Sequence, residues 1–140
     1  MSRDLTIEHN GITYTGQIAI VESTFLGMED HGIFTANVAF KAGGWGQGTG
    51  HYCLDAPIKD EDGKFLRREG TGYGMDYIMA VIEVFGARSW ESIKGMSAIV
   101  LRENDYGMIL GIAHLHDENK VLVFTEHLEA WMEAHGGQFV

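Results

Sequence analysis

The sequence contains one strong helical pattern, between Met75 and Phe85, and the rest of the fold has to accommodate it. Apolar residues recur there at spacings of three and four, which places them along one face of a helix. The residues of this first stripe are Met75, Ile78, Met79, Ile82 and Phe85. Gly86 follows, at the position where a left-handed residue that caps a helix C-terminus is expected.

A second apolar stripe runs along the same helix through Tyr77, Val81 and Val84. A surface helix of a small monomer should have a wider polar face than Asp76 and Glu83 provide. Either a sheet covers one side of the helix and another element the other, or the second stripe contacts a partner subunit. We favour the partner subunit and therefore expect a homo-oligomer.

A basic, glycine-rich segment leads into this helix and supplies candidate ligand-binding residues. The backbone amides of the first turn of a helix have no partners within the helix, so an anion binds there favourably. Two arginines lie close enough in sequence to reach the same place. The candidates in this segment are Arg67, Arg68, Gly70, Thr71, Gly72 and Gly74. The alternative is a tight turn whose arginines point into solvent.

Most of the remaining sequence has the pattern of β-strands. Asn10-Gly11 predicts a hairpin turn between residues 5 and 15. Polar residues 60–63 predict a surface turn, and alternating apolar residues are typical of half-buried antiparallel strands. Strands are predicted at residues 17–26, 34–40, 98–102, 108–116 and 120–124.

A second helix is predicted at the C-terminal end of the sequence. Thr125 is expected to cap it, and Leu128, Trp131 and Met132 are expected to form its buried stripe. Strands, a helix, more strands and a final helix predict an α+β fold with a mainly antiparallel sheet, one central helix and a C-terminal helix. The length fits a single domain over residues 1–140.

Glycine occupies every second position between residues 44 and 50. If this segment is extended, one face is bare backbone and the other carries Trp45, Gln47, Thr49 and His51. A bare face lets a flat ring, another backbone or a subunit approach closely. The alternative is a plain glycine-rich loop between two strands.

Composition restricts the classes of function. With 20 acidic and 10 basic residues, the net charge is −10, which argues against binding to DNA or RNA polymers but allows a small anionic ligand. No apolar run is long enough to span a bilayer. The single cysteine, Cys53, excludes an internal disulfide and suits a reducing cytoplasm. We therefore expect a cytoplasmic protein with no membrane contact.

A nucleotide pocket needs donors for phosphate, a flat group for the base and amides for the base edges. Apart from the segment before the central helix, the sequence offers Trp90, Arg102 and Asn104 as further candidates. Trp90 has core packing as its alternative role, and Arg102 has that of a surface charge.

Two histidines provide an alternative based on metal chemistry. His114 and His116 share one face of a predicted strand and, with Asp117 or Glu118, are potential metal ligands. A third ligand at a reliable spacing is absent from the sequence, as is a nucleophile motif. We therefore expect no catalytic residue, no bound metal and no cofactor.

Several motifs resemble a widespread family of small phage-encoded proteins, most of them uncharacterised. The motifs are Glu29-Asp30-His31-Gly32, the alternating glycines at 44–50, Arg-x-Gly-Thr-x-x-Gly-Met at 68–75, Ser89-Trp90-Glu91 and Gly111-Ile112-x-His114. In function the chain is similar to the anti-Thoeris sponges, oligomers that bind cyclic ADP-ribose-type signals without cleaving them and also hold cyclic oligonucleotides. The resemblance covers about residues 10–116, and none of that family's binding residues is carried over.

We therefore expect an oligomeric protein of the host cytoplasm that sequesters a phosphate-bearing nucleotide immune signal, a cyclic ADP-ribose isomer or a cyclic oligonucleotide. One alternative is a metal-dependent enzyme that acts on such a ligand through His114 and His116. The other is an inhibitor that docks onto a host defence protein through the glycine strand and the acidic surface.

Overall fold

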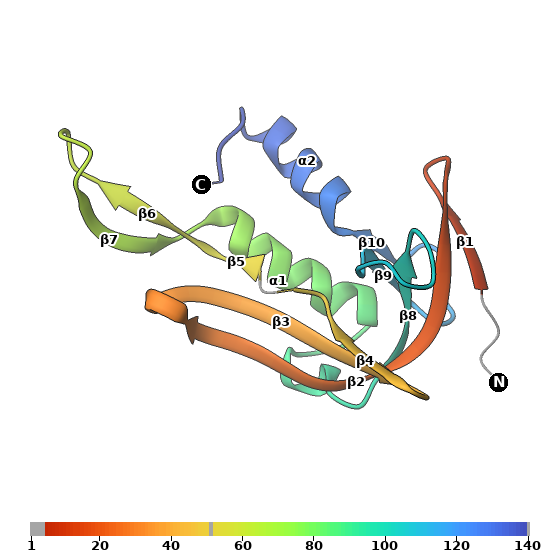
Figure 1. The fold of residues 1–140 in the computed structure, drawn as a ribbon. Coiled ribbons are helices and arrows are strands. Elements are labelled where there is room, and N and C mark those ends of the chain that lie inside the picture. Colours follow the sequence, from red (N-terminus) through yellow and green to blue (C-terminus); the bar gives the residue numbers. More distant parts are fainter. Residues whose placement is uncertain (1–4, 51, 140) are drawn as a thin grey trace.

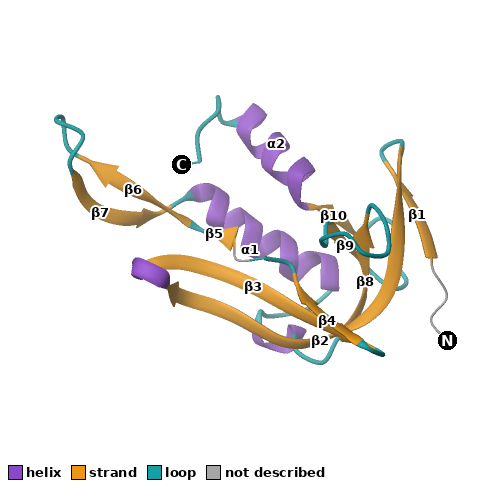
Figure 2. Cartoon of the chain, in the orientation of Figure 1, coloured by secondary structure: helices purple, strands orange, loops and turns teal. Residues whose placement is uncertain are grey.

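The computed structural model describes residues 5–50 and 52–139, and Figures 1 and 2 show how their helices and strands are arranged. In chain order the elements are β1 (Leu5–His9), β2 (Ile12–Glu29), η1 (Asp30–Gly32), β3 (Ile33–Ala42), β4 (Trp45–Gly48), β5 (Tyr52–Cys53), β6 (Asp55–Lys59), β7 (Phe65–Gly70), α1 (Gly72–Phe85), η2 (Glu91–Ile93), β8 (Ser97–Arg102), β9 (Gly111–Ala113), β10 (Val121–Val123) and α2 (Phe124–Ala134). The predicted α+β fold, with a mostly antiparallel sheet, a central helix and a C-terminal helix, is confirmed.

The main sheet is built around β2, an antiparallel strand of 18 residues. The strand order is β10-β9-β8-β2-β3-β4, with β1 joined to β2 and β5 joined to β3. A bulge between Val21 and Ser23 interrupts the pairing of β2 with β3, and bulges of this kind bend a strand and increase its twist. The predicted hairpin turn is also confirmed, since Asn10 and Gly11 both have positive φ.

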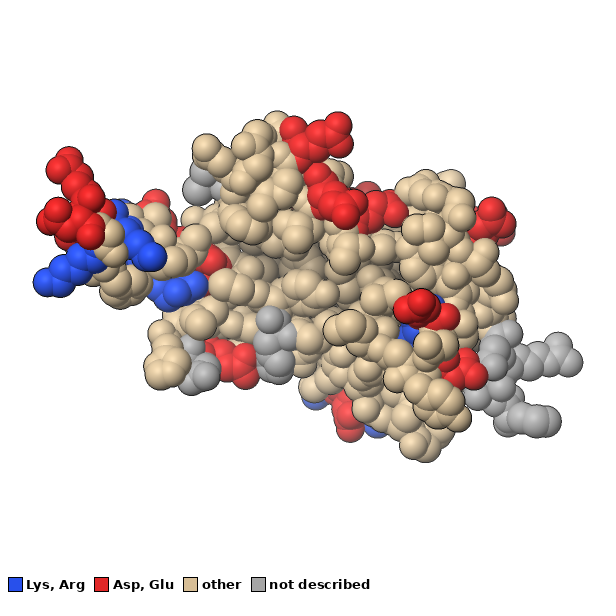
Figure 3. All heavy atoms as spheres, turned by 45° about the horizontal axis from the view of Figure 1, so that its top comes forward, with Lys and Arg blue, Asp and Glu red and all other residues tan. Residues whose placement is uncertain are grey.

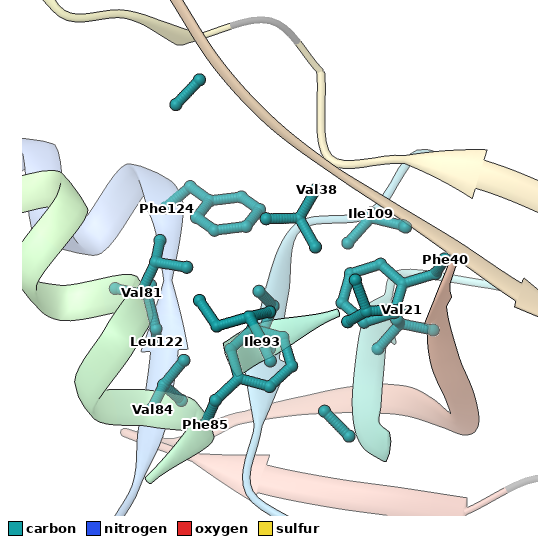
Figure 4. Packing of buried hydrophobic residues seen from close by; sticks show 14 of the residues in the cluster. Val21, Val38, Phe40, Val81, Val84, Phe85, Ile93, Ile109, Leu122 and Phe124 are labelled. Carbon is teal, nitrogen blue, oxygen red and sulfur yellow. The ribbon is translucent and has the colours of Figure 1, made fainter. Parts of the chain in front are cut away.

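Helix α1 packs on one face of this sheet through its second apolar stripe. Val81 is fully buried, and in Figure 4 Val81 and Val84 lie in the main core with Leu122 and Phe124. The prediction that this stripe contacts a partner subunit is therefore wrong. The outward face of α1 carries Met75 and Met79 of the first stripe, and Met79 is 59% exposed, whereas Phe85 of that stripe is buried in the main core. Toward the sheet, α1 buries two valines and the rings of Tyr77 and Phe85.

Both ends of α1 are capped within the chain. Gly86 has φ +65°, as predicted for a left-handed cap, and its N–H donates to the carbonyl of Glu83 at 2.9 Å. At the other end, the Thr71 hydroxyl accepts from the N–H of Gly74 at 2.9 Å and donates to the carbonyl of Leu54 at 2.9 Å. Gly74 lies against the backbone of Leu54, with no room for a side chain.

Residues 67–70 were predicted to be part of a turn, but they belong to strand β7. This strand pairs with β6 in a separate two-stranded hairpin that extends away from the main sheet (Figure 1). The polar turn predicted at residues 60–63 connects the two strands. The sequence pattern did not show β7 because its side chains are largely exposed on both faces, which removes the alternation of apolar and polar residues.

The C-terminal elements are shorter than predicted. Strands β9 and β10 have three residues each: most of the strand expected at 108–116 is loop, whereas the strand expected at 120–124 forms at Val121–Val123 and gives way to α2 at Phe124. Helix α2 begins at Phe124, its one buried residue, without a side-chain cap, so Thr125 does not cap it. The stripe expected to be buried is only partly covered: Leu128, Trp131 and Met132.

Candidate functional site

The two arginines before α1 are both engaged in ion pairs with acidic residues. The guanidinium of Arg68 makes a two-pronged contact with the buried carboxylate of Asp55, with Nε–Oδ2 and Nη2–Oδ1 distances of 2.9 Å. This hydrogen bonding is the main reason why the pKa of Asp55 is lowered to about 2. Arg67 pairs with Glu69 at 2.9 Å on the exposed surface of the hairpin.

The amides that open α1 also have partners within the chain. The N–H of Tyr73 donates to the carbonyl of Phe139 at 2.9 Å, and Thr71 accepts from the N–H groups of Gly74 and Met75. Gly72 is the first residue of the helix and Gly70 the last of β7. These candidates thus lie next to one another along the chain, but their main hydrogen-bond donors already bond to acceptors within the chain.

Trp90 and Asn104 have structural surroundings of their own. The ring of Trp90 is 8% exposed and belongs to the main core, which agrees with the alternative of core packing. The side-chain oxygen of Asn104 accepts from the N–H of Tyr106 at 3.0 Å and closes the turn that follows β8. Of these two candidates, Asn104 lies close in sequence to the remaining one, Arg102.

Arg102 is the predicted candidate with the most distinctive surroundings. It is only 5% exposed, at the end of β8. Its Nε and Nη2 donate to the side-chain oxygen of Gln47 at 3.2 and 2.8 Å, and its Nη1 donates to the side-chain oxygen of Gln17 at 3.1 Å. The guanidinium also lies over the ring of Trp45, 4.4 Å from the ring centroid, in a cation–π contact. The alternative of a surface charge is therefore wrong for Arg102.

The register of the sheet explains how these groups come together. Arg102 pairs with Thr15 of β2, and Gln17 lies two residues further along that strand, on the same face. Strand β4 supplies Trp45 and Gln47 from one of its faces, while Gly46 and Gly48 occupy the other. The alternation predicted for the glycine run therefore holds over β4, and the predicted position of His51 lies outside the described residues.

The charge of Arg102 has no ion-pair partner among the described residues. Among residues 5–50 and 52–139, no carboxylate makes an ion pair with it, and its hydrogen-bond acceptors are the amide oxygens of two uncharged glutamines. Burial lowers the pKa of Arg102, and the negative charge of Asp105 acts in the opposite direction. A guanidinium has five N–H groups, of which three are used here, so two are left for another acceptor.

A groove of about 490 Å³ adjoins this guanidinium. Its lining residues are Gln17, Trp45, Gly46, Gln47, Arg102, Asp105, Tyr106 and Gly107. The indole N–H of Trp45 is buried and has no hydrogen-bond partner within the part of the chain that the structure describes. The groove thus combines a buried cation with aromatic surface.

The wider surface is dominated by acidic residues. On the face shown in Figure 3, most of the visible Lys and Arg side chains lie on the projecting β6–β7 hairpin beside Asp and Glu side chains, and further Asp and Glu side chains are spread over the rest. An anionic ligand therefore has to be recognised locally, because the field of the whole protein repels it.

The two histidines line a different cavity, of about 620 Å³. They do not share a strand face, because β9 ends at Ala113, and His114 and His116 lie in the loop beyond it. The Nδ1 of His114 accepts from the backbone N–H groups of His116 and Asp117, at 3.1 and 2.9 Å. No group of three or more His, Cys, Asp or Glu residues that could hold a metal occurs within the described ranges.

Arg102 and Asn104 were thus among the predicted candidates, whereas Gln17, Trp45 and Gln47 were not. The alternation of residues 45–48 put Trp45 and Gln47 on one face, but nothing local connected that face with Arg102.

No described helix has the length and apolar character needed to cross a membrane. No family model, curated protein or solved structure matches the chain.

Proposed function

We propose that the protein binds a small phosphate-bearing nucleotide in the groove beside Arg102 and holds it without cleaving it. The observation that carries this proposal is Arg102, a residue only 5% exposed whose guanidinium, within the described residues, donates to uncharged acceptors. Burying a charge is costly unless a group of opposite charge compensates it. A bound anion would provide that compensation.

The geometry suits a phosphate or another oxyanion. Gln47 and Gln17 fix the plane of the guanidinium from three of its N–H groups, so the two remaining N–H groups are oriented before a ligand arrives. Charge-assisted hydrogen bonds of this kind are about twice as strong as neutral ones. The low dielectric around a buried arginine strengthens them further.

The size of the groove favours a small ligand over a polymer. Its volume of about 490 Å³ falls within the range of small-molecule sites. A polyanion would also have to approach the acidic surface, against a net charge of −10. Sequestration of a nucleotide immune signal, a cyclic ADP-ribose isomer or a cyclic oligonucleotide, is the biological role that follows from the phage-family resemblance, and we include it in this proposal.

A capture-and-release experiment tests the proposal. The protein is incubated with AMP, cyclic ADP-ribose or a cyclic dinucleotide, separated from free ligand and denatured, and the released ligand is identified by mass spectrometry. Recovery of the intact nucleotide supports a binding protein. Recovery of a converted nucleotide would instead support an enzyme, and no capture of any of the three contradicts nucleotide binding.

Substitution of one exposed residue of the groove tests the proposal without disturbing the fold. Asp105 is exposed and lines the groove, and its charge opposes a bound anion. Asp105→Asn is therefore expected to tighten nucleotide binding, whereas Asp62→Asn, in the exposed turn between β6 and β7, removes the same charge elsewhere and should leave the affinity unchanged. An equal effect of the two changes would mean that the nucleotide binds away from Arg102.

A further inference from the structure

Tyr106 lines the same groove as Arg102, but it is almost entirely exposed. Its side chain is 98% exposed, although tyrosine usually covers part of its ring with protein. It lies in the turn that follows β8 and lines the groove. The nearby Met108 is also exposed but does not line the groove.

The backbone that carries Tyr106 is tied to the arginine site. Asn104 closes the turn by accepting from the N–H groups of Tyr106 and Gly107, at 3.0 and 3.2 Å. The carbonyl of Gly107 accepts from the side-chain amide of Gln47 at 3.4 Å, and the oxygen of that same amide holds Arg102. The Tyr106 backbone is thus connected to Arg102 through one glutamine, while its ring is left in solvent.

We infer that Tyr106 is the second recognition element of the groove and stacks on the flat ring of a ligand whose anionic group is bound by Arg102. This inference rests on the proposed function and extends it, because it requires the ligand to carry an aromatic base as well as a phosphate. Gly46 and Gly107 line the groove without side chains, which leaves room for a planar group between the tyrosine and the arginine. Stacking would remove the exposed ring from water.

The inference predicts different affinities for two phosphate compounds of similar charge. AMP has a base and ribose 5-phosphate does not, so the wild-type protein is expected to bind AMP more tightly, by about tenfold to a hundredfold, the usual effect of one base stacked on an aromatic side chain. Tyr106→Ala is expected to remove this advantage and to leave the affinity for ribose 5-phosphate unchanged. Tyr106→Phe keeps the aromatic face and should retain the preference for AMP.

Titration calorimetry of wild type, Tyr106→Ala, Tyr106→Phe and the control Met108→Ala with both ligands tests the inference. A preference for AMP that is lost only in Tyr106→Ala supports it. If wild type binds AMP and ribose 5-phosphate with equal affinity, or if Tyr106→Ala weakens the binding of both equally, the role of Tyr106 is contradicted. Anion binding at Arg102 is not contradicted by either result. If wild type binds neither compound, the proposed function and this inference fall together.

Discussion

Gly74 provides the sharpest test of how α1 is seated on the rest of the fold. The substitution Gly74→Ala adds one methyl group in the first turn of the helix. That Cβ would overlap with the carbonyl oxygen of Leu54 and would lie 2.9 Å from its Cα and carbonyl carbon, distances that Cβ atoms do not reach without a shift. The obstacle is backbone and not a flexible side chain, so the helix and the segment at Leu54 would have to move apart.

The expected magnitude follows from two opposing effects. Alanine is favoured over glycine by about 1 kcal/mol in a helix interior, and by less at a helix end. Overpacking typically costs about 1–3 kcal/mol. Separation from Leu54 would also weaken the two hydrogen bonds that Thr71 donates to its carbonyl, each worth about 0.5–1.5 kcal/mol. We therefore expect a net loss of about 1–3 kcal/mol in the free energy of unfolding.

Urea denaturation of wild type, Gly74→Ala and Gly70→Ala measures this difference. Gly70 is the matched control, because it lies at the end of β7 and a Cβ there would have no neighbour within 4 Å. Its substitution is expected to change the free energy of unfolding by less than about 0.5 kcal/mol. If Gly74→Ala is as stable as wild type or more stable, α1 does not rest on the Leu54 backbone and the reasoning is refuted.

Two further substitutions test the ion pair and the core. Arg68→Ala is expected to lower the free energy of unfolding at pH 7, because it leaves the carboxylate of Asp55 without its partner. The ion pair lowers the pKa of Asp55 from 3.8 to about 2, so this deficit should vanish as the pH falls through that interval, and a deficit that does not depend on pH would contradict the ion pair. Val81→Glu places a charge in the core and should unfold the protein rather than dissociate an oligomer, whereas Met79→Glu on the outward face of α1 should fold normally. Circular dichroism and light scattering measure folding and oligomeric state of both variants. A Val81→Glu variant that is folded but dissociated would indicate a subunit contact at this position.

The two helices and the longer strands of the main sheet were predictable from the sequence because local patterns determine them, whereas β7 has no such pattern. The spacing of apolar residues located α1, and Gly86 marked its end. The orientation of α1 was not predictable, because both of its stripes are apolar. The choice between Val81 and Met79 as the buried residue depends on the space available above the sheet, which no local pattern describes.

The candidate site was predictable only in part, for a related reason. Arg102 could be singled out because basic residues are scarce in this chain. Its partners Gln47 and Gln17 are 55 and 85 residues away, and they meet it only through the register of the sheet. The sequence predicts Arg68 as a ligand-binding residue because the helix start follows it closely, but the pairing of β6 with β7 brings it to Asp55 instead.

The central claim, that Arg102 binds the anionic group of a nucleotide, is tested most directly by calorimetric titration of AMP into wild type, Arg102→Gln and Arg67→Gln. Both substitutions remove one positive charge, but Arg67 lies on the exposed hairpin and Arg102 in the groove. Loss of a hydrogen bond to a charged group is worth about 1.5–3 kcal/mol, so Arg102→Gln should weaken AMP binding by roughly tenfold to a hundredfold while Arg67→Gln binds as wild type does. Thermal unfolding of each variant confirms that it is folded at the temperature of the titration. Equal affinities of folded Arg102→Gln and wild type would contradict the claim and place the nucleotide elsewhere on the protein.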